Sequence, residues 1–257
     1  MKLNKLIAIA TISLLSGGIS MAQKALNLED IVAGNIIQTK GIGSMTWLKD
    51  GERYSRLENN KQTGGTDIVA YRAKDNSREV IIPSSLLTDK STGRPIPVRS
   101  VSWSADNEKI LIYNNTRRVW RYDTRGDYWV LNLKDGALRQ LGKGMPESSM
   151  MFAKFSPDGT RVAYVSNNNI YVEDIDSGKI TQLTKDGSDT IVNGTFDWVY
   201  EEEFSCRDGF RWSPDGKHIA YWQSDTKGTG VFDIINNVDS ILSLIHISEP
   251  TRLRRIS

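Results

Sequence analysis

The chain has 257 residues, of which 39% are hydrophobic and 25% charged, with a formal net charge of +2 at pH 7. This composition is that of an ordinary globular protein, and it excludes a wholly disordered chain. Lysines near the N-terminus and arginines within residues 243–257 supply the positive excess, and without both ends the charge falls to about −2. Because no basic field remains, we expect no nucleic-acid partner.

The first 22 residues have the layout of a secretory signal peptide. Lys2 and Lys5 form a charged start, and an apolar run extends over residues 6–15. The small residues Ser20 and Ala22 then precede a cleavage position. The apolar run is shorter than the ~20 residues of a stable membrane span, although a retained anchor is the alternative. We therefore expect an exported bacterial protein, periplasmic or secreted, without a stable membrane span.

A short helix is predicted at the start of the mature chain. Asn27 can cap this helix, and Glu29 and Asp30 fall in its first turn. Gly34 is a suitable residue to end it. The rest of the chain has the patterns of strands and turns.

The main feature of the sequence is an internal repeat, in which an aromatic residue precedes a turn signal and a strand-like run. The aromatic residues recur at intervals of 56, 52 and 57 residues, and they are Trp47, Trp103, Phe155 and Trp212. A period near fifty residues is the length of one four-stranded propeller blade. We therefore predict an all-β fold, a partial β-propeller of about three and a half four-stranded blades over residues 23–241. An antiparallel sandwich with accidental regularity is the alternative.

The turn that follows each aromatic residue contains Asp-Gly, or Asp-Asn in the second repeat. Glycine and asparagine tolerate the positive φ angles that tight hairpins require. The runs that follow, such as residues 161–165 and 218–222, are apolar at alternate positions. We therefore expect one face of each strand to be buried between neighbouring blades.

A second hairpin follows within the same units and completes the count of four strands. Residues 170–175 and 180–183 are strand-like and are joined by the turn 176–179. Residues 128–133 and the turn 134–136 repeat this arrangement in the preceding unit. Two hairpins in each unit give the four strands of a propeller blade.

The blade pattern stops after residue 241. Closed propellers need at least four blades, so we expect an incomplete ring whose open strand edges favour aggregation. Residues 242–257 lack the turn spacing of the earlier units and resemble translated adapter sequence. We interpret them as a non-native tail and exclude them from functional reasoning.

Cys206 is the single cysteine, so no disulfide can form within the chain. A nucleophilic cysteine needs a histidine base, and the chain contains only His218 and His246. We interpret Cys206 as an unreactive thiol beside a binding loop.

The segment 197–204, Asp-Trp-Val-Tyr-Glu-Glu-Glu-Phe, contains three adjacent carboxylates that repel one another. If the segment is a short helix that projects from a blade, Glu202 and Glu203 can hold a primary ammonium through charge-assisted hydrogen bonds. A solvated acidic loop is the alternative. Three adjacent residues rarely supply the six or more oxygen ligands of Ca²⁺, so we expect no metal and no cofactor.

Together with the turn at residues 212–216, this segment resembles the glutamate motif of the dipeptidyl peptidase IV branch of the prolyl oligopeptidase family. The resemblance extends from about residue 26 to residue 241. It implies that Glu202 and Glu203 grip the free N-terminal amine of a peptide substrate. The segment 119–122, Val-Trp-Arg-Tyr, resembles the setting of a family arginine, which implies that Arg121 contacts a substrate carbonyl. An exposed hairpin arginine is the alternative for Arg121.

The resemblance further implies a serine exopeptidase that removes Xaa-Pro or Xaa-Ala dipeptides. Such chemistry needs a Gly-x-Ser-x-Gly elbow and later Asp and His residues on an α/β-hydrolase domain, and the chain has no such elbow. We therefore expect no catalytic residue here, and an inactive chain whose partners are peptides with a free N-terminus and the missing hydrolase domain. A homodimer is a further candidate assembly. The competing hypothesis is a non-enzymatic periplasmic propeller that acts as a binding scaffold.

Overall fold

The computed structural model describes residues 27, 28, 32, 41, 43–236 and 243–248. By their internal contacts the residues form two units, Met1–Gly43 and Ser44–Ser257, and all strands lie in the second. Leu28 and Val32 are helical and exposed, in agreement with the short helix predicted there. The predicted signal peptide and the remainder of that helix lie outside the described residues. Within the described part of the chain, no helix is long and apolar enough to cross a membrane.

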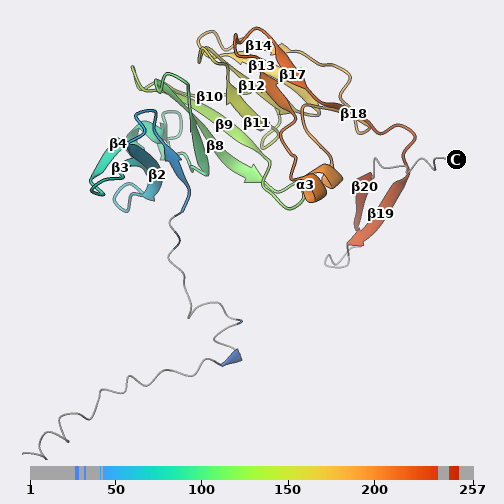
Figure 1. Cartoon of the computed structure of the whole chain (residues 1–257), viewed down its shortest axis with the longest axis horizontal. Coiled ribbons are helices and arrows are strands. Elements are labelled where there is room, and N and C mark those ends of the chain that lie inside the picture. Colours follow the sequence, from blue (N-terminus) through green and yellow to red (C-terminus); the bar gives the residue numbers. More distant parts are fainter. Residues whose placement is uncertain (1–26, 29–31, 33–40, 42, 237–242, 249–257) are drawn as a thin grey trace, which may run out of the picture. The chain divides into compact units, whose positions relative to one another are not determined.

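Three four-stranded antiparallel sheets follow one another along the chain (Figure 1). The strands of the first sheet are β1 (Met45–Trp47), β2 (Arg53–Asn59), β3 (Thr66–Arg72) and β4 (Arg78–Ile82). Those of the second are β7 (Ser100–Trp103), β8 (Lys109–Arg117), β9 (Arg125–Asn132) and β10 (Leu138–Gln140). Those of the third are β11 (Met151–Phe155), β12 (Arg161–Ser166), β13 (Asn169–Asp174) and β14 (Ile180–Gln182). Each strand pairs with its neighbour in the sequence, as in a propeller blade, so the predicted fold is confirmed.

The first hairpin of a sheet is stabilised by the same side-chain network in three of the repeats. In the third sheet the Ser156 hydroxyl donates to Asp158 Oδ1 at 2.5 Å and accepts from the Arg161 N–H at 3.0 Å. Equivalent contacts are made by Ser104 with Asp106 and by Ser213 with Asp215. The predicted turn chemistry is therefore confirmed, because the network repeats with the aromatic residues.

Only the second residue of each Asp-Gly or Asp-Asn pair has a positive φ. Gly159, for example, has φ of 66°, and its N–H donates to the Ser156 carbonyl at 2.9 Å. This is a type I turn followed by a left-handed residue. Asn107 occupies the same position in the second sheet with φ of 60°, which asparagine tolerates better than other non-glycine residues.

The core consists of layers between successive sheets, and this corrects the expectation that one face of each strand is buried. Val162 and Tyr164 of β12 pack in a cluster with residues of the second sheet. Ala163 and Val165 of the same strand pack on the opposite side, with Phe210. All four β12 residues have 0% exposure. Both faces are buried because this strand lies between two other sheets, so alternate residues face different neighbours.

A connection between the first two sheets was not predicted. It consists of the 3-10 helix η1 (Ser84–Leu87) and a small hairpin of β5 (Thr88–Asp89) and β6 (Arg94–Pro95). The Asp67 carboxylate of β3 accepts a 2.7 Å hydrogen bond from the Ser84 N–H and so orders the start of η1. Leu87 completes the core layer between the first and second sheets.

The fourth repeat is arranged as two short strand pairs. Its strands are β15 (Ile191–Asn193), β16 (Phe210–Trp212), β17 (Ile219–Tyr221) and β18 (Gln223–Asp225). β15 pairs with β18, and β16 pairs with β17. A final hairpin joins β19 (Val231–Asn236) to β20 (Ser243–Ser248), and β20 lies within the residues that we interpret as a non-native tail. The foreign origin of that tail stays a prediction.

Candidate functional site

The acidic segment forms a helix, α3 (Trp198–Phe204), that interrupts one strand of the fourth sheet. β15 and β16 pair with the consecutive strands β18 and β17, so they form one interrupted strand opposite a continuous partner. Trp222 joins the two halves, since its carbonyl accepts from the Gly194 N–H and its N–H donates to the Gly209 carbonyl, both at 2.9 Å. The helix thus projects from a blade, which is the first of the two alternatives that the sequence left open (Figure 1).

The two ends of the projection approach each other closely at its base. An isolated bridge pairs Thr195 with Asp208. A Cβ atom at Gly209 would lie 2.9 Å from the carbonyl carbon of Gly194, so only glycine fits there without a shift of the backbone. The base is therefore a closed neck that fixes where α3 leaves the sheet.

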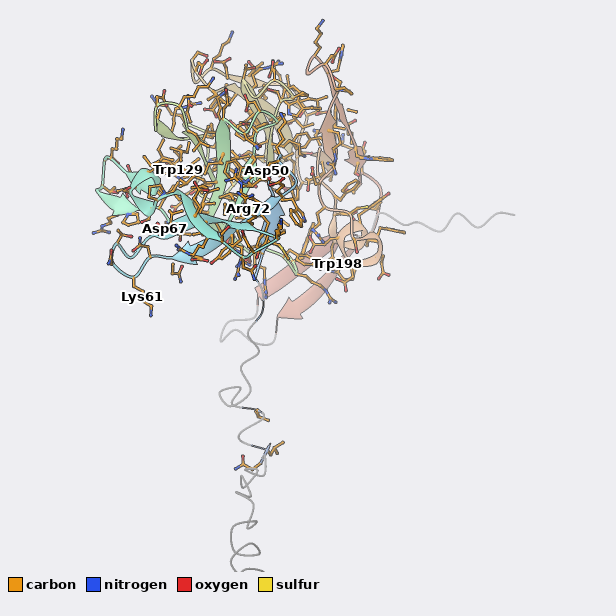
Figure 2. All side chains as sticks on the ribbon, turned by 60° about the vertical axis from the view of Figure 1, so that its left-hand side comes forward. Asp50, Lys61, Asp67, Arg72, Trp129 and Trp198 are labelled. Carbon is orange, nitrogen blue, oxygen red and sulfur yellow. The ribbon has the colours of Figure 1, made fainter. Side chains whose placement is uncertain are left out.

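Both ends of α3 are capped. Asp197 accepts a 3.1 Å hydrogen bond from the Tyr200 N–H, which satisfies one free donor of the first turn. Ser205 adopts the left-handed conformation with φ of 53°, and the helix ends there. Trp198 marks the start of the helix in Figure 2. Cys206 follows the helix and lines a pocket beside it, and that its thiol is unreactive stays a prediction.

Lys154 of β11 attaches the neck to the third sheet. Its ammonium lies 2.5 Å from Asp208 Oδ1 and 3.0 Å from the Phe210 carbonyl oxygen, and 3.4 Å from the centre of the Phe210 ring. Arg211 lies 2.8 Å from the other carboxylate oxygen of Asp208. Burial lowers the pKa of Lys154 to about 8, against the opposing effect of Asp208. No local pattern in the sequence indicates this contact, which joins residues 54 positions apart.

Glu201 is the buried member of the glutamate triplet, with an exposure of 4%. Its Oε1 atom accepts a 3.2 Å hydrogen bond from the main-chain N–H of Arg121, in the loop between β8 and β9. A buried carboxylate with a main-chain partner is a structural contact. Glu201 therefore ties this loop to α3, a role that the sequence did not indicate.

Glu202 and Arg121, two of the three predicted site residues, form an ion pair. The Glu202 side chain is 18% exposed and that of Arg121 is 67% exposed. Arg121 contacts Glu202 Oε1, whereas Glu202 Oε2 is a buried oxygen without a hydrogen-bond partner among the described residues. A buried carboxylate oxygen without a donor is unfavourable, so this atom can accept from a ligand.

Glu203, the third predicted residue, is exposed at the next position of the helix. In the described part of the chain its side chain has neither a hydrogen bond nor an ion pair. Adjacent helical side chains do not face each other at their base, so Glu202 and Glu203 can share a ligand only through their carboxylate ends. The arrangement offers one partly neutralised and one free carboxylate to a cation.

A pocket of about 830 Å³ lies beside the start of α3. Its walls include Trp120 and Arg125 from the β8–β9 hairpin, and Phe196 and Asp197 from the projection. Burial raises the pKa of Asp197, and its Oδ2 atom is buried without a hydrogen-bond partner among the described residues. The hairpin and the projection that hold Arg121 against Glu202 therefore also enclose this pocket.

Ser213, Asp215 and His218 lie close together but do not have the geometry of a catalytic triad. The Ser213 hydroxyl donates to Asp215 at 2.6 Å and accepts from the main-chain N–H of His218 at 2.9 Å. These are the turn contacts found in the other repeats, and a nucleophilic serine would instead be hydrogen-bonded to the imidazole. Among the described residues, no group of three metal-ligating side chains could hold an ion.

Comparisons with known proteins agree with this fold. A family model described as the dipeptidyl peptidase IV (DPP IV) N-terminal region matches residues 104–242. The Chaetomium globosum protein named probable dipeptidyl-aminopeptidase B is 35% identical over 135 residues, 52% of this chain and 15% of that protein. Its namesake in Aspergillus terreus is 28% identical over 220 residues, 82% of this chain and 24% of that protein. The chain thus spans about a quarter or less of these relatives.

A solved structure supports the same assignment of the fold. The crystal structure of Porphyromonas gingivalis dipeptidyl peptidase 4 matches with a TM-score of 0.72 and 24% identity. The match covers 88% of this chain and 31% of that chain. The family resemblance found in the sequence is therefore confirmed. This chain belongs to the dipeptidyl peptidase IV family, and it contains residues of the N-terminal propeller region of that family.

Proposed function

We propose that this chain binds the free N-terminal amine of peptides and is the substrate-gating propeller of a serine exopeptidase. The observation that carries the proposal is the unpartnered, buried Oε2 atom of Glu202 beside the exposed carboxylate of Glu203. A primary ammonium has three N–H donors and can bond to both carboxylates at once. The complete enzyme would remove Xaa-Pro or Xaa-Ala dipeptides from peptide N-termini.

The amine site explains why cleavage would be restricted to a dipeptide. A substrate whose amine is fixed at Glu202 and Glu203 presents only the peptide bond at a set distance from that amine to a nucleophile. Arg121, which contacts Glu202, is exposed enough to bind the first carbonyl oxygen of the same substrate. Substrate positioning is then the work of three side chains on two segments.

The chemical step belongs to an α/β-hydrolase domain that we propose as the partner of this propeller. It would supply the nucleophilic serine, the histidine base and the aspartate. The names of two relatives, a dipeptidyl-aminopeptidase and a dipeptidyl peptidase, support a peptidase partner. We further propose that residues 1–22 direct export to the periplasm or the medium. Sequencing the source gene beyond the codon for Ile241 would test the proposed partner, since the frame should continue to a Gly-x-Ser-x-Gly elbow.

Calorimetric titration with a free-amine Ala-Pro peptide and its N-acetyl derivative tests the binding function directly. We expect acetylation, Glu202→Gln and Glu203→Gln each to weaken binding by roughly tenfold or more, since each removes a charge-assisted hydrogen bond worth about 1.5–3 kcal/mol. Glu52→Gln is the matched control, because Glu52 is an exposed glutamate paired with Arg72 in the first sheet. Equal affinity for both peptides would contradict the amine site and favour a non-enzymatic binding scaffold.

A further inference from the structure

Two arginines stand opposite each other in the hairpin that carries Arg121. Arg117 of β8 and Arg125 of β9 are cross-strand partners in the sheet register. Opposite residues project from the same face of a sheet, and like charges in this arrangement destabilise it. Among the described residues, neither arginine has a side-chain hydrogen bond or a carboxylate within 4.0 Å. The two positive charges are therefore not neutralised by this part of the chain.

Arg125 has the greater need of a negatively charged partner, because it is half-buried. Burial and the charge of Arg117 both lower its pKa. An arginine nevertheless remains charged at any pH of interest, and a charge removed from water is favourable only when paired. An anion that contacts Arg125 would remove both the desolvation penalty and the repulsion from Arg117.

Space for such an anion exists beside Arg125. Arg125 and Trp120 line the pocket of about 830 Å³, with Phe196 on the projection. The other charged residues that line it are Lys227, Asp189 and Asp197. Lys227 and Asp189 are exposed, and Asp197 caps α3 through Oδ1 while its Oδ2 atom has no hydrogen-bond partner among the described residues. Trp120 and Phe196 provide apolar surface for methylene groups next to the guanidinium.

The pocket and the proposed amine site have walls in common. The loop of Trp120 also carries Arg121, and the projection of Phe196 also carries Glu202. A peptide whose amine is bound at Glu202 therefore contacts the same two segments that line the pocket of Arg125. We infer that this pocket binds the side-chain carboxylate of an acidic residue near the N-terminus of the peptide. The inference rests on the proposed function and names acidic peptides as its favoured ligands.

The test compares glutamate with glutamine in otherwise identical peptides. The probes are Ala-Pro-Gly-Gly-amide peptides in which glutamate or glutamine replaces position one, three or four, titrated calorimetrically into the full chain. We expect the glutamate form to bind about tenfold more tightly at one position at least, as for one charge-assisted contact. Equal affinity of the glutamate and glutamine forms at all three positions would overturn the inference.

Variants identify the residue that binds the side-chain carboxylate of the peptide. Arg125→Gln should abolish the preference for glutamate and leave the affinity for the glutamine peptides unchanged. Arg94→Gln, an exposed arginine of β6, is the matched control and should keep the preference. A preference that persists in Arg125→Gln would overturn the assignment to this pocket. If Arg125→Gln folds poorly, Arg117→Gln is the second variant, and it should reduce the preference for glutamate. An unchanged preference in Arg117→Gln would also count against the site.

The outcome is separable from that of the proposed function. Acetylation of the glutamine peptides tests the amine site alone, because these peptides carry no carboxylate. Amine-dependent binding without a glutamate preference would remove only the inference about Arg125. If binding does not depend on a free amine, the proposed function is wrong. The inference about Arg125 then fails as well, because it assumes a peptide that is bound by its amine.

Discussion

The main-chain N–H of Arg121 donates a hydrogen bond to the buried carboxylate of Glu201, across 80 positions of the sequence. The same arginine pairs through its side chain with Glu202, the next residue of α3. Two consecutive glutamates thus hold one residue at two points. The loop between β8 and β9 is fixed against the helix by the first contact, and the charge of Arg121 is placed by the second.

Glu201 should act on ligand binding through Arg121 alone. Glu201→Ala removes the acceptor of the Arg121 N–H, so the loop loses its fixed position, and we expect several-fold weaker binding of a free-amine Ala-Pro peptide. Glu201→Gln keeps a carbonyl acceptor and should bind nearly as the unmodified chain does. Calorimetric titration of both variants measures this, with thermal unfolding followed in parallel. Equal losses in both variants would indicate that the charge of Glu201, and not its contact, is required.

Replacement of Arg121 should have opposite effects on two kinds of ligand. Arg121→Met frees Glu202 Oε1, so a plain primary amine such as butylammonium should bind several-fold more tightly. A peptide should bind more weakly, because its carbonyl loses a charged donor. Competition titrations with the two ligands measure the split. If both affinities move in the same direction, Arg121 does not have the double role proposed for it.

Lys154 should make the stability of the fourth sheet depend on pH. Its pKa is about 8 in the folded chain, below the ordinary lysine value of 10.5, so between these values the unfolded chain binds more protons. This group therefore adds stability as the pH rises from about 8 towards 10.5, and the addition is absent below pH 8. Urea unfolding of the unmodified chain and of Lys154→Met at pH 7.5 and at pH 10 measures this effect. The unfolding free energy of the unmodified chain, relative to that of Lys154→Met, should be higher at pH 10 than at pH 7.5.

The neck itself provides a control for that experiment. Asp208→Asn removes the carboxylate partner of Lys154 but leaves the lysine buried. The combined variant of both residues should lose less stability than the sum of the single variants, because the two groups are in contact. Additive losses would mean that Lys154 and Asp208 do not stabilise each other.

The serine of the repeated turn should matter most where it is buried. Ser156 is 1% exposed, and its hydroxyl donates to Asp158 and accepts from the Arg161 N–H, so Ser156→Ala should reduce the unfolding free energy by about 1–3 kcal/mol. Ser213 makes the same contacts in a more exposed turn, and Ser213→Ala should cost about half as much because water replaces the hydroxyl. Chemical denaturation of the two variants measures the decrease in unfolding free energy. A larger decrease for Ser213→Ala than for Ser156→Ala would contradict the prediction.

The repeated hairpins could be predicted because their information is local. The turn network around Ser156 joins residues at most five positions apart, and Gly159 satisfies its φ requirement within the same turn. For residues 197–204 the sequence left a projecting helix and a solvated acidic loop as alternatives, and the structure shows the helix. Strand order then followed from the antiparallel pairing of neighbours.

Contacts between distant segments could not be predicted in this way. The pairing of Lys154 with Asp208 depends on how the third and fourth sheets stack, which no local pattern specifies. The hairpin of β5 and β6 is too short to have a periodic signal. Burial of both faces of β12 also depends on a neighbouring sheet, so alternation alone indicated a single buried face. The sequence motif nominates Glu202 and Glu203, whose role stays a prediction, whereas the pairing of Glu202 with Arg121 is visible only in the fold.

The hydrogen bonds of Trp222 allow the strand ladder to pass the insertion point without a gap. The described strand pairs of the fourth sheet thus include no residue of 196–207, and the main-chain hydrogen bonds of Gly194 and Gly209 to Trp222 keep the flanking strands in register. A loop attached in this manner can change its sequence with little effect on the register that supports it. The proposed amine-binding carboxylates Glu202 and Glu203 are consequently separate from the residues that hold the strands of the fourth sheet together, which would let variants alter α3 and retain the sheet.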